Sequence, residues 1–136
     1  MKVSDRMTRD VVTLDEDQSL REALGLQQRH KIRHIPVVSG AAVVGILTDR
    51  DLKRATPSLL TGVDQEAYDQ LLDNTRVDQV MTRNPHTVSP DTPLKEVAEI
   101  LIEHKFGSLP VIDANRLVGI ITDIDLLGAL SELLGE

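Results

Sequence analysis

The chain has 136 residues, a formal net charge of −7 and no cysteine. The acidic balance disfavours nucleic-acid binding, which needs a basic face to neutralise phosphates. The lack of cysteine excludes disulfides and thiolate metal sites. No apolar stretch approaches the ~20 residues of a membrane span. We therefore expect a cytoplasmic protein that binds neither nucleic acid nor membranes.

The first part of the chain predicts a strand, a helix, two more strands and a second helix. Ser19 and Glu22 form a capping-box pattern at the start of the first helix. The apolar runs on either side of the Ser39-Gly40 turn predict a hairpin. The expected ranges are 11–14 for the first strand, 19–31 for the first helix, 35–38 and 43–47 for the hairpin, and 50–54 for the second helix.

A linker then precedes a second set of elements. Within the linker, Pro57 is expected to end the preceding helix, and 64–72 predicts an additional one. Thr92 followed by proline predicts the N-cap of the next helix. The buried face of that helix is expected to comprise Leu94, Val97, Ala98, Leu101 and Ile102. Strands at 109–112 and 117–121 form a second hairpin, and the apolar stretch 126–134 is expected to pack on its own module, a second copy or a further domain.

An internal repeat organises the whole chain. Val3 to Lys53 matches Val77 to Leu127 without a gap, at an offset of 74 residues. Matching segments include Met7-Thr8-Arg9 with Met81-Thr82-Arg83. A module of ~50 residues buries too little surface to be stable alone. We therefore expect two modules that pack on each other, with clefts at their interface.

Each repeat contains the pattern Thr-x-x-Asp directly after an apolar strand, as Thr48 with Asp51 and as Thr122 with Asp125. The simplest interpretation is a helix-capping pair. The same geometry also suits a nucleotide, because a helix start favours phosphate and the carboxylate can accept hydrogen bonds from ribose hydroxyls. Both interpretations can hold at once.

A basic run precedes the first hairpin. His30 and Lys31 have counterparts in the second repeat and suit the end of a helix. Arg33 and His34 lie nearer the strand and could face a cleft, whereas the second repeat has glycine and serine there. The four histidines show no metal-ligand spacing. No motif pairs a nucleophile with a base, so we expect neither a metal site nor catalytic residues.

These motifs resemble the cystathionine-β-synthase (CBS) domain family. The resemblance lies in Met-Thr near the start of each repeat, in His-Lys-x-x-x-x-Pro-Val and in Gly-x-x-Thr-Asp-x-Asp-Leu. Residues 47–58 are similar to the bacterial acetoin-utilisation type. The family implies an α/β (α+β) fold, with a tandem pair called a Bateman module, β-α-β-β-α order and pseudo-twofold symmetry. The expected division is CBS domain 1 at 1–55, a linker with a short helix at 56–76, and CBS domain 2 at 77–136.

The resemblance also implies ligands and residue roles. The family's usual ligands are AMP, ADP, ATP and S-adenosylmethionine, bound in two clefts. By position, the first cleft would comprise Thr48, Asp51, Arg33 and His34 around ribose and phosphate, with Thr87, Phe106, Gly107 and Leu109 around adenine. The second would comprise Thr122 and Asp125, with Thr13 and Ile35 opposite. Because Gly107 and Ser108 carry no positive charge, the second cleft is expected to be weak for phosphates, empty, or suited to a less charged adenosine.

We therefore expect a non-enzymatic regulatory module that binds an adenine nucleotide, most readily AMP, and needs no other cofactor. Its expected partners are a second copy, in a homodimer, and a regulated enzyme or transporter. One alternative is a dimerisation scaffold without a ligand, which the apolar C-terminal stretch favours. A second alternative is a nucleotide hydrolase, which only the abundance of carboxylates favours.

Overall fold

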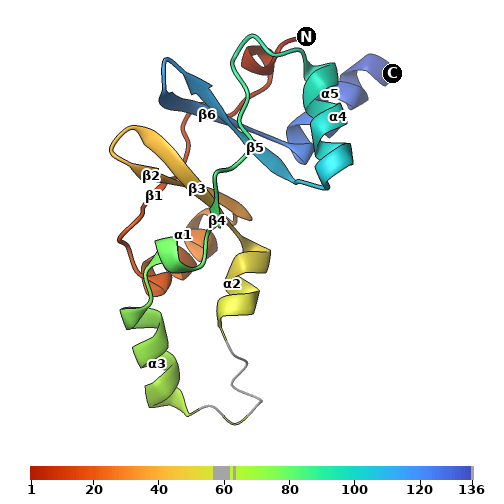
Figure 1. Cartoon of the computed structure of the whole chain (residues 1–136). Helices are drawn as coiled ribbons and strands as arrows, with labels where there is room; N and C mark the ends of the chain where they lie inside the picture. The colour runs from red at the N-terminus through yellow and green to blue at the C-terminus, as the bar shows by residue number, and fades with distance from the viewer. Residues whose placement is uncertain (57–61, 63, 136) are drawn as a thin grey trace. The chain divides into compact units, whose positions relative to one another are not determined.

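The computed structural model describes residues 1–56, 62 and 64–135. The expected helix end at Pro57, most of the Pro57–Val63 part of the linker and Glu136 lie outside the described residues. The chain folds into two packing units. We call Val12–Asn84 the Asp51 unit, and Met1–Val11 with Pro85–Glu136 the Asp125 unit. Figure 1 shows the elements of both units, each of which is described by itself below.

The Asp51 unit contains a four-stranded sheet in the order β1-β2-β3-β4. Strand β1 pairs with β2 in parallel, and the other neighbours are antiparallel. The strands are β1 (Leu14–Asp15), β2 (His34–Ser39), β3 (Ala42–Thr48) and β4 (Thr82–Arg83). The described helices are α1 (Leu20–His30), α2 (Asp49–Ala55), α3 (Gln65–Asn74) and the short 3-10 turn η3 (Val77–Gln79). The linker helix predicted at 64–72 is thus present as α3.

Helix α1 begins as the sequence predicts, with Ser19 as its N-cap. Ser19 Oγ accepts from Glu22 N, and the Glu22 carboxylate accepts from Ser19 N. Gln18 Nε2 also donates to Glu22 at 2.6 Å. This bond from Gln18, followed by the one from Ser19 N, lowers the pKa of Glu22 from its ordinary 4.5. On the same helix Arg21 donates to Asp73 of α3, and this bond raises the pKa of the Arg21 guanidinium.

The core of the Asp51 unit forms where β2 and β3 meet α1 and α2. Each large apolar side chain that is fully buried there contributes roughly 1.5–3 kcal/mol. The buried members of this core are Leu14, Leu20, Ala23, Ile35, Val37, Leu47, Leu52, Leu72, Val77 and Met81.

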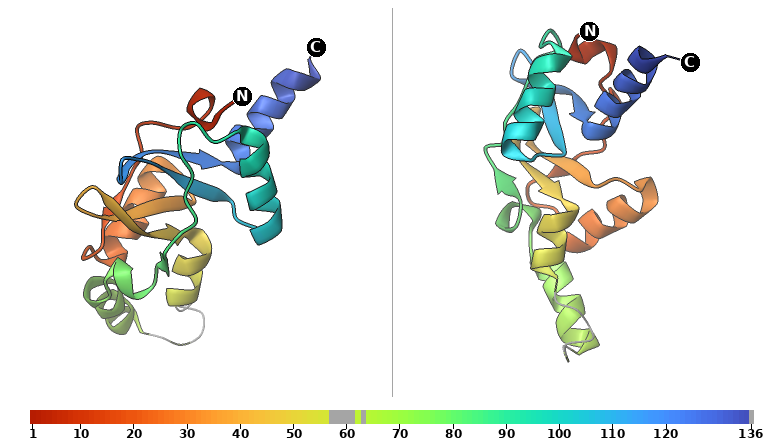
Figure 2. Two further views of the ribbon diagram at one scale, coloured as in Figure 1. Left: turned by 45° about the horizontal axis from the view of Figure 1, so that its top comes forward. Right: turned by 90° about the vertical axis from the view of Figure 1, so that its right-hand side faces the viewer.

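The Asp125 unit is built on one antiparallel hairpin, which can be followed with its helices in Figure 2. Its elements are η1 (Val3–Asp5), α4 (Leu94–His104), β5 (Ser108–Asp113), β6 (Arg116–Thr122) and α5 (Asp123–Leu134). In place of a first strand it has a single parallel bridge from Val88 to Val111. Its core comprises Val3, Val88, Leu94, Val97, Leu101, Leu109, Val111, Ile121 and Ala129.

Two details of α4 differ from the prediction. The N-cap is Pro93, not Thr92. The Thr92 hydroxyl instead accepts from Ser89 N at 3.1 Å, so it closes the turn before the helix. The buried face of α4 in the structure is also narrower than the sequence predicted. Ile102 is 77% exposed, whereas Leu101 belongs to the core.

The opening segment of each repeat packs in the unit that holds the other repeat's hairpin. Strand β4 pairs with β3 at Gly45 and Ile46. In the Asp125 unit, Thr8 pairs with Ile120 in the same way. A Cβ on Gly45 would lie 2.9 Å from the carbonyl oxygen of Thr82. Glycine at this position therefore allows the two strands to approach each other closely.

Candidate functional site

The Thr-x-x-Asp pattern of the first repeat forms a reciprocal cap at the start of α2. Thr48 N donates to Asp51 Oδ2 at 3.0 Å, and Asp51 N donates to Thr48 Oγ1 at 3.1 Å. Asp51 is only 8% exposed. The capping interpretation of this pair is therefore confirmed. A buried carboxylate with its orientation fixed is also suited to accepting further hydrogen bonds.

A residue that the sequence analysis did not select completes this site. Thr82 Oγ1 lies 3.4 Å from both carboxylate oxygens of Asp51 and can donate to either. It reaches Asp51 because β4 pairs Thr82 with Ile46 on β3, the strand that leads into α2. The two residues are 31 positions apart. The Met-Thr match between the repeats pointed to Thr82, but it carried no information on its partner.

The basic residues of the first repeat lie at the same end of the sheet. His34 is directly opposite Thr48 in the β2–β3 pairing. The carbonyl oxygen of Arg33 accepts from Asp49 N at 2.9 Å, which ties the start of β2 to the start of α2. Arg33 is exposed and His34 is half-buried. The structure thus brings Thr48, Asp51, Arg33 and His34 together.

The two other predicted residues of this unit lie elsewhere in it. Ile35 is 1% exposed and belongs to the hydrophobic core. Thr13 is half-buried and immediately precedes β1.

The Asp125 unit repeats the cap at the start of α5. Thr122 N donates to Asp125 Oδ2 at 2.9 Å, and Asp125 N donates to Thr122 Oγ1 at 3.2 Å. Asp123 N donates to the carbonyl oxygen of Gly107 at 2.9 Å, as Asp49 does to Arg33. Asp125 is half-buried, so its carboxylate is more open than that of Asp51.

The remaining predicted residues of this unit are distributed over three places. Phe106 is 40% exposed and stacks on His104, with ring centroids 5.1 Å apart. Leu109 is 1% exposed and belongs to the core. Thr87 lines an open pocket of ≈ 400 Å³ beside α4.

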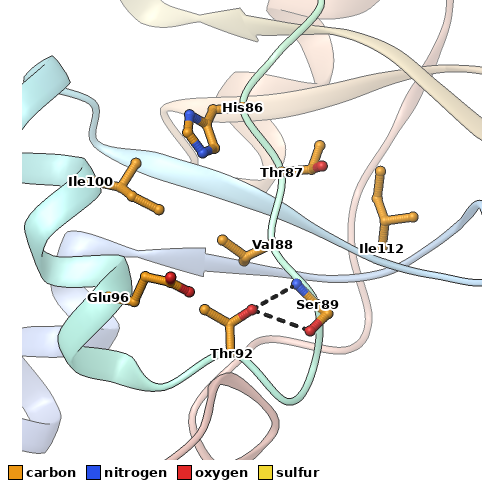
Figure 3. A pocket seen from close by; sticks show the side chains of 8 residues that line it. All are labelled: His86, Thr87, Val88, Ser89, Thr92, Glu96, Ile100 and Ile112. Carbon is orange, nitrogen blue, oxygen red and sulfur yellow. Dashed lines mark hydrogen bonds between the residues drawn. The ribbon is translucent and has the colours of Figure 1, made fainter.

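The pocket at Thr87 is shown in Figure 3. Glu96 and Ile100 enter it from α4, and Ile112 enters it from β5. The other lining residues come from the extended segment before α4, namely His86, Val88, Ser89 and Thr92. Apart from Thr87, the sequence analysis selected none of these as a ligand-binding residue, because they form no binding motif.

Two kinds of feature are absent from the part of the chain that the structure describes. No group of three or more His, Asp or Glu side chains there could hold a metal ion. None of the helices described there is long and apolar enough to cross a bilayer.

The tandem sheets, the repeated caps and the exchanged opening segments define a pair of CBS domains. The CBS-domain model matches residues 3–58 and 77–132, and the chain belongs to this family. Among solved structures, it is similar to a protein assigned to acetoin utilisation (AcuB) from Vibrio cholerae. The two are 36% identical with a TM-score of 0.79, over 98% of this chain and 93% of the other. The predicted fold class and the acetoin-utilisation resemblance are thus confirmed.

Two further solved structures contain adenosine compounds. CBSX2, a protein from Arabidopsis thaliana, was solved in complex with AMP; it is 29% identical, with a TM-score of 0.81 and 98% of each chain covered. Protein MJ0100 was solved with 5′-methylthioadenosine and S-adenosyl-L-methionine; it is 27% identical, with the same TM-score and coverage. Several curated relatives have enzyme names, and the chain covers only 22% to 24% of their lengths.

Proposed function

We propose that the chain is a regulatory module that binds an adenine nucleotide and changes its conformation or its partner binding in response. AMP is the first candidate, with ADP, ATP and S-adenosylmethionine as alternatives. The observation that carries the proposal is the pair of Thr hydroxyl and Asp carboxylate at the start of a helix in both repeats. The ligands of CBSX2 and MJ0100 support the adenosine class.

In this proposal Asp51 accepts hydrogen bonds from the ribose hydroxyls. Bonds to a charged group contribute roughly 1.5–3 kcal/mol each. Arg33 and His34 bind the phosphate, because both lie beside the Thr48 cap at the start of β2. We propose Thr87, Phe106 and Gly107 as contacts of an adenine, and Thr122, Asp125 and Thr13 as contacts of a second ligand. Leu109 and Ile35 are each 1% exposed and lie in the cores of their units.

We propose a regulatory role for the chain rather than a catalytic one. We propose that it acts in the cytoplasm as a homodimer and transmits ligand binding to an enzyme or a transporter. Ligand binding can shift a conformational equilibrium only by its differential affinity for the two states. The receiving partner must therefore distinguish the liganded from the unliganded form.

A ligand-free dimerisation scaffold is the second candidate function. It is favoured by the apolar side chains that α5 leaves on its surface. Exposed apolar residues gathered on one element mark interaction sites in soluble proteins. On α5 these are Ile124, Leu127, Leu130, Leu133 and Leu134.

Calorimetry on protein stripped of ligand tests the proposal against this alternative. AMP is expected to bind with a micromolar dissociation constant, about −8 kcal/mol. Asp51→Asn keeps an acceptor for the Thr48 cap but removes the charge, and should weaken AMP binding about tenfold or more. Asp49→Asn is the matched control, since only its backbone contacts Arg33.

The scaffold makes the opposite prediction for the same samples. It would give no heat with AMP, ADP, ATP or S-adenosylmethionine, while wild type and Asp51→Asn would sediment as the same dimer. That combination would refute nucleotide binding.

A further inference from the structure

Basic side chains gather on the exposed side of helix α2 in the Asp51 unit. Arg50, Lys53 and Arg54 are all exposed. Residues three or four positions apart share one face of a helix, so these three cations lie together. They lie on the side of α2 opposite Asp51 and Leu52, which are buried.

Further cations lie beside α2, where the chain leaves α1. The carbonyl oxygen of Arg33 accepts from Asp49 N at 2.9 Å, so the backbone of Arg33 lies at the start of α2. Arg29 and Lys31 come just before it, at the end of α1, and the side chains of all three are exposed. We call the following six residues the basic surface: Arg29, Lys31, Arg33, Arg50, Lys53 and Arg54.

The cations of the basic surface have no carboxylate partners within the fold. None of them forms an ion pair with a residue that the structure describes. The helix dipole favours cations near the end of a helix, which accounts for Lys53 and Arg54 in the last turn of α2. Arg50 lies in the first turn of α2, and Arg33 precedes a strand. Helix stability therefore does not explain these two cations.

The second repeat has a different character at the same positions. The three cations of α2 correspond to Ile124, Leu127 and Gly128 of α5. Ile124 is 61% exposed and Leu127 is 58% exposed. The exposed large apolar side chains among the described residues all belong to the Asp125 unit. One copy of this helix face thus suits an apolar partner, and the other copy suits an anionic one.

An acidic polypeptide segment fits the basic surface better than other anionic macromolecules or a second copy do. A second copy that presented the same surface would place cations against cations, which is repulsive. Nucleic acid is disfavoured by the net charge of −7. Neither Tyr68 nor Phe106 belongs to the basic surface, so neither provides a ring there on which a base could stack. Carboxylates need only charge-assisted hydrogen bonds from guanidinium and ammonium groups, and the surface offers both.

We propose that the basic surface binds an acidic segment of the protein that receives the signal. The inference rests on the proposed function, because it specifies the partner of the regulatory module. Arg33 belongs to the basic surface and is also a proposed phosphate contact. A nucleotide phosphate and an acidic segment therefore compete for Arg33, and each weakens the binding of the other by the same factor.

Fluorescence anisotropy with a labelled octaglutamate peptide tests the inference on ligand-free full-length protein at low ionic strength. The peptide should bind wild type, and added salt should weaken binding because it screens exposed charges. The double variant Lys53→Glu, Arg54→Glu should weaken binding about tenfold or more. The neutral double variant Lys53→Gln, Arg54→Gln should weaken it about threefold, and it avoids placing negative charge at the end of α2.

A matched control changes the same amount of charge on the other unit. Lys95 and Arg116 are exposed positions of the Asp125 unit. Lys95→Glu, Arg116→Glu should bind the peptide within about twofold of wild type, because charges beyond a Debye length are largely screened.

Calorimetry with AMP on the same proteins separates this inference from the proposed function. AMP binding without peptide binding, or with an equal loss of peptide affinity in the control, overturns the inference and leaves the proposed function standing. Peptide binding that depends on Lys53 and Arg54, without AMP binding to wild type, supports the basic surface and refutes the nucleotide site. Saturating AMP that leaves the peptide affinity unchanged refutes the competition through Arg33.

Two further measurements address other occupants of the basic surface. A thymidine oligonucleotide that binds more tightly than the peptide would assign the surface to nucleic acid. A Lys53→Glu, Arg54→Glu protein that sediments as a smaller species than wild type would assign it to a second copy. Either result overturns the proposal.

Discussion

Gly45→Ala should destabilise the Asp51 unit by crowding the contact between β3 and β4. The new Cβ would lie 2.9 Å from the carbonyl oxygen of Thr82 and just as close to Cγ of Met81. A flexible methionine can move, but the carbonyl belongs to the paired strand and can move only with β4. Overpacking of this kind costs about 1–3 kcal/mol. A shift of β4 also takes Thr82 Oγ1 away from Asp51.

Urea unfolding followed by circular dichroism measures this cost. Gly128→Ala is the control, because its added Cβ would meet no atom within 4 Å beyond the neighbouring backbone of α5 itself. Gly128 lies inside α5, so alanine there should stabilise by about 0.5–1 kcal/mol. Gly119→Ala tests the counterpart contact, where the Cβ would lie 2.9 Å from the Thr8 carbonyl. A Gly45→Ala protein as stable as wild type, alongside a normal control, would refute the close-approach argument.

Three further predictions use the same unfolding assay. Ser19→Ala removes the N-cap of α1 and should lower the free energy of unfolding by about 0.5–2 kcal/mol. Thr92→Ala should lower it by less, because Thr92 is not the N-cap of α4; an equal loss would contradict this. Leu101→Ala should cost about 2–5 kcal/mol, whereas Ile102→Ala should stay within about 0.5 kcal/mol; similar losses would contradict the exposure of Ile102. Because the folded-state pKa of Glu22 is lowered, its stabilisation is present above pH 4.5 and lost as the pH falls through the lowered value. The difference between wild type and Glu22→Gln should thus shrink between pH 7 and pH 3, and a constant difference would argue against it.

The local parts of the fold could be predicted because their signals are short-range. The capping boxes at Ser19, Thr48 and Thr122 involve residues three positions apart, and all three are present. The hairpins follow from apolar runs separated by turn residues. The repeat then extended each local inference to the other half of the chain.

What the sequence did not reveal depends on contacts between distant segments. Thr82 reaches Asp51 only because its strand joins the sheet of the other repeat. The exposure of Ile102 depends on which neighbours α4 meets, and helical spacing alone does not state this. In the sequence, Ser108 was noted only because it is not a basic residue, unlike its counterpart His34. Its unpaired hydroxyl becomes visible once the burial of β5 is known.

Each repeat's opening segment packs with the hairpin of the other repeat, so dividing the chain in the linker separates paired segments. A fragment that stops in the linker keeps the hairpin of β2 and β3 but loses β4, which covers the edge beside Gly45. It also keeps residues 1–11, whose own partner is the β5–β6 hairpin. Such a fragment has an uncovered strand edge and an unpaired strand-forming segment, so two fragments can pair their strands with each other. Single halves of this chain should therefore be recovered as interlocked pairs or as aggregates, and not as free monomers.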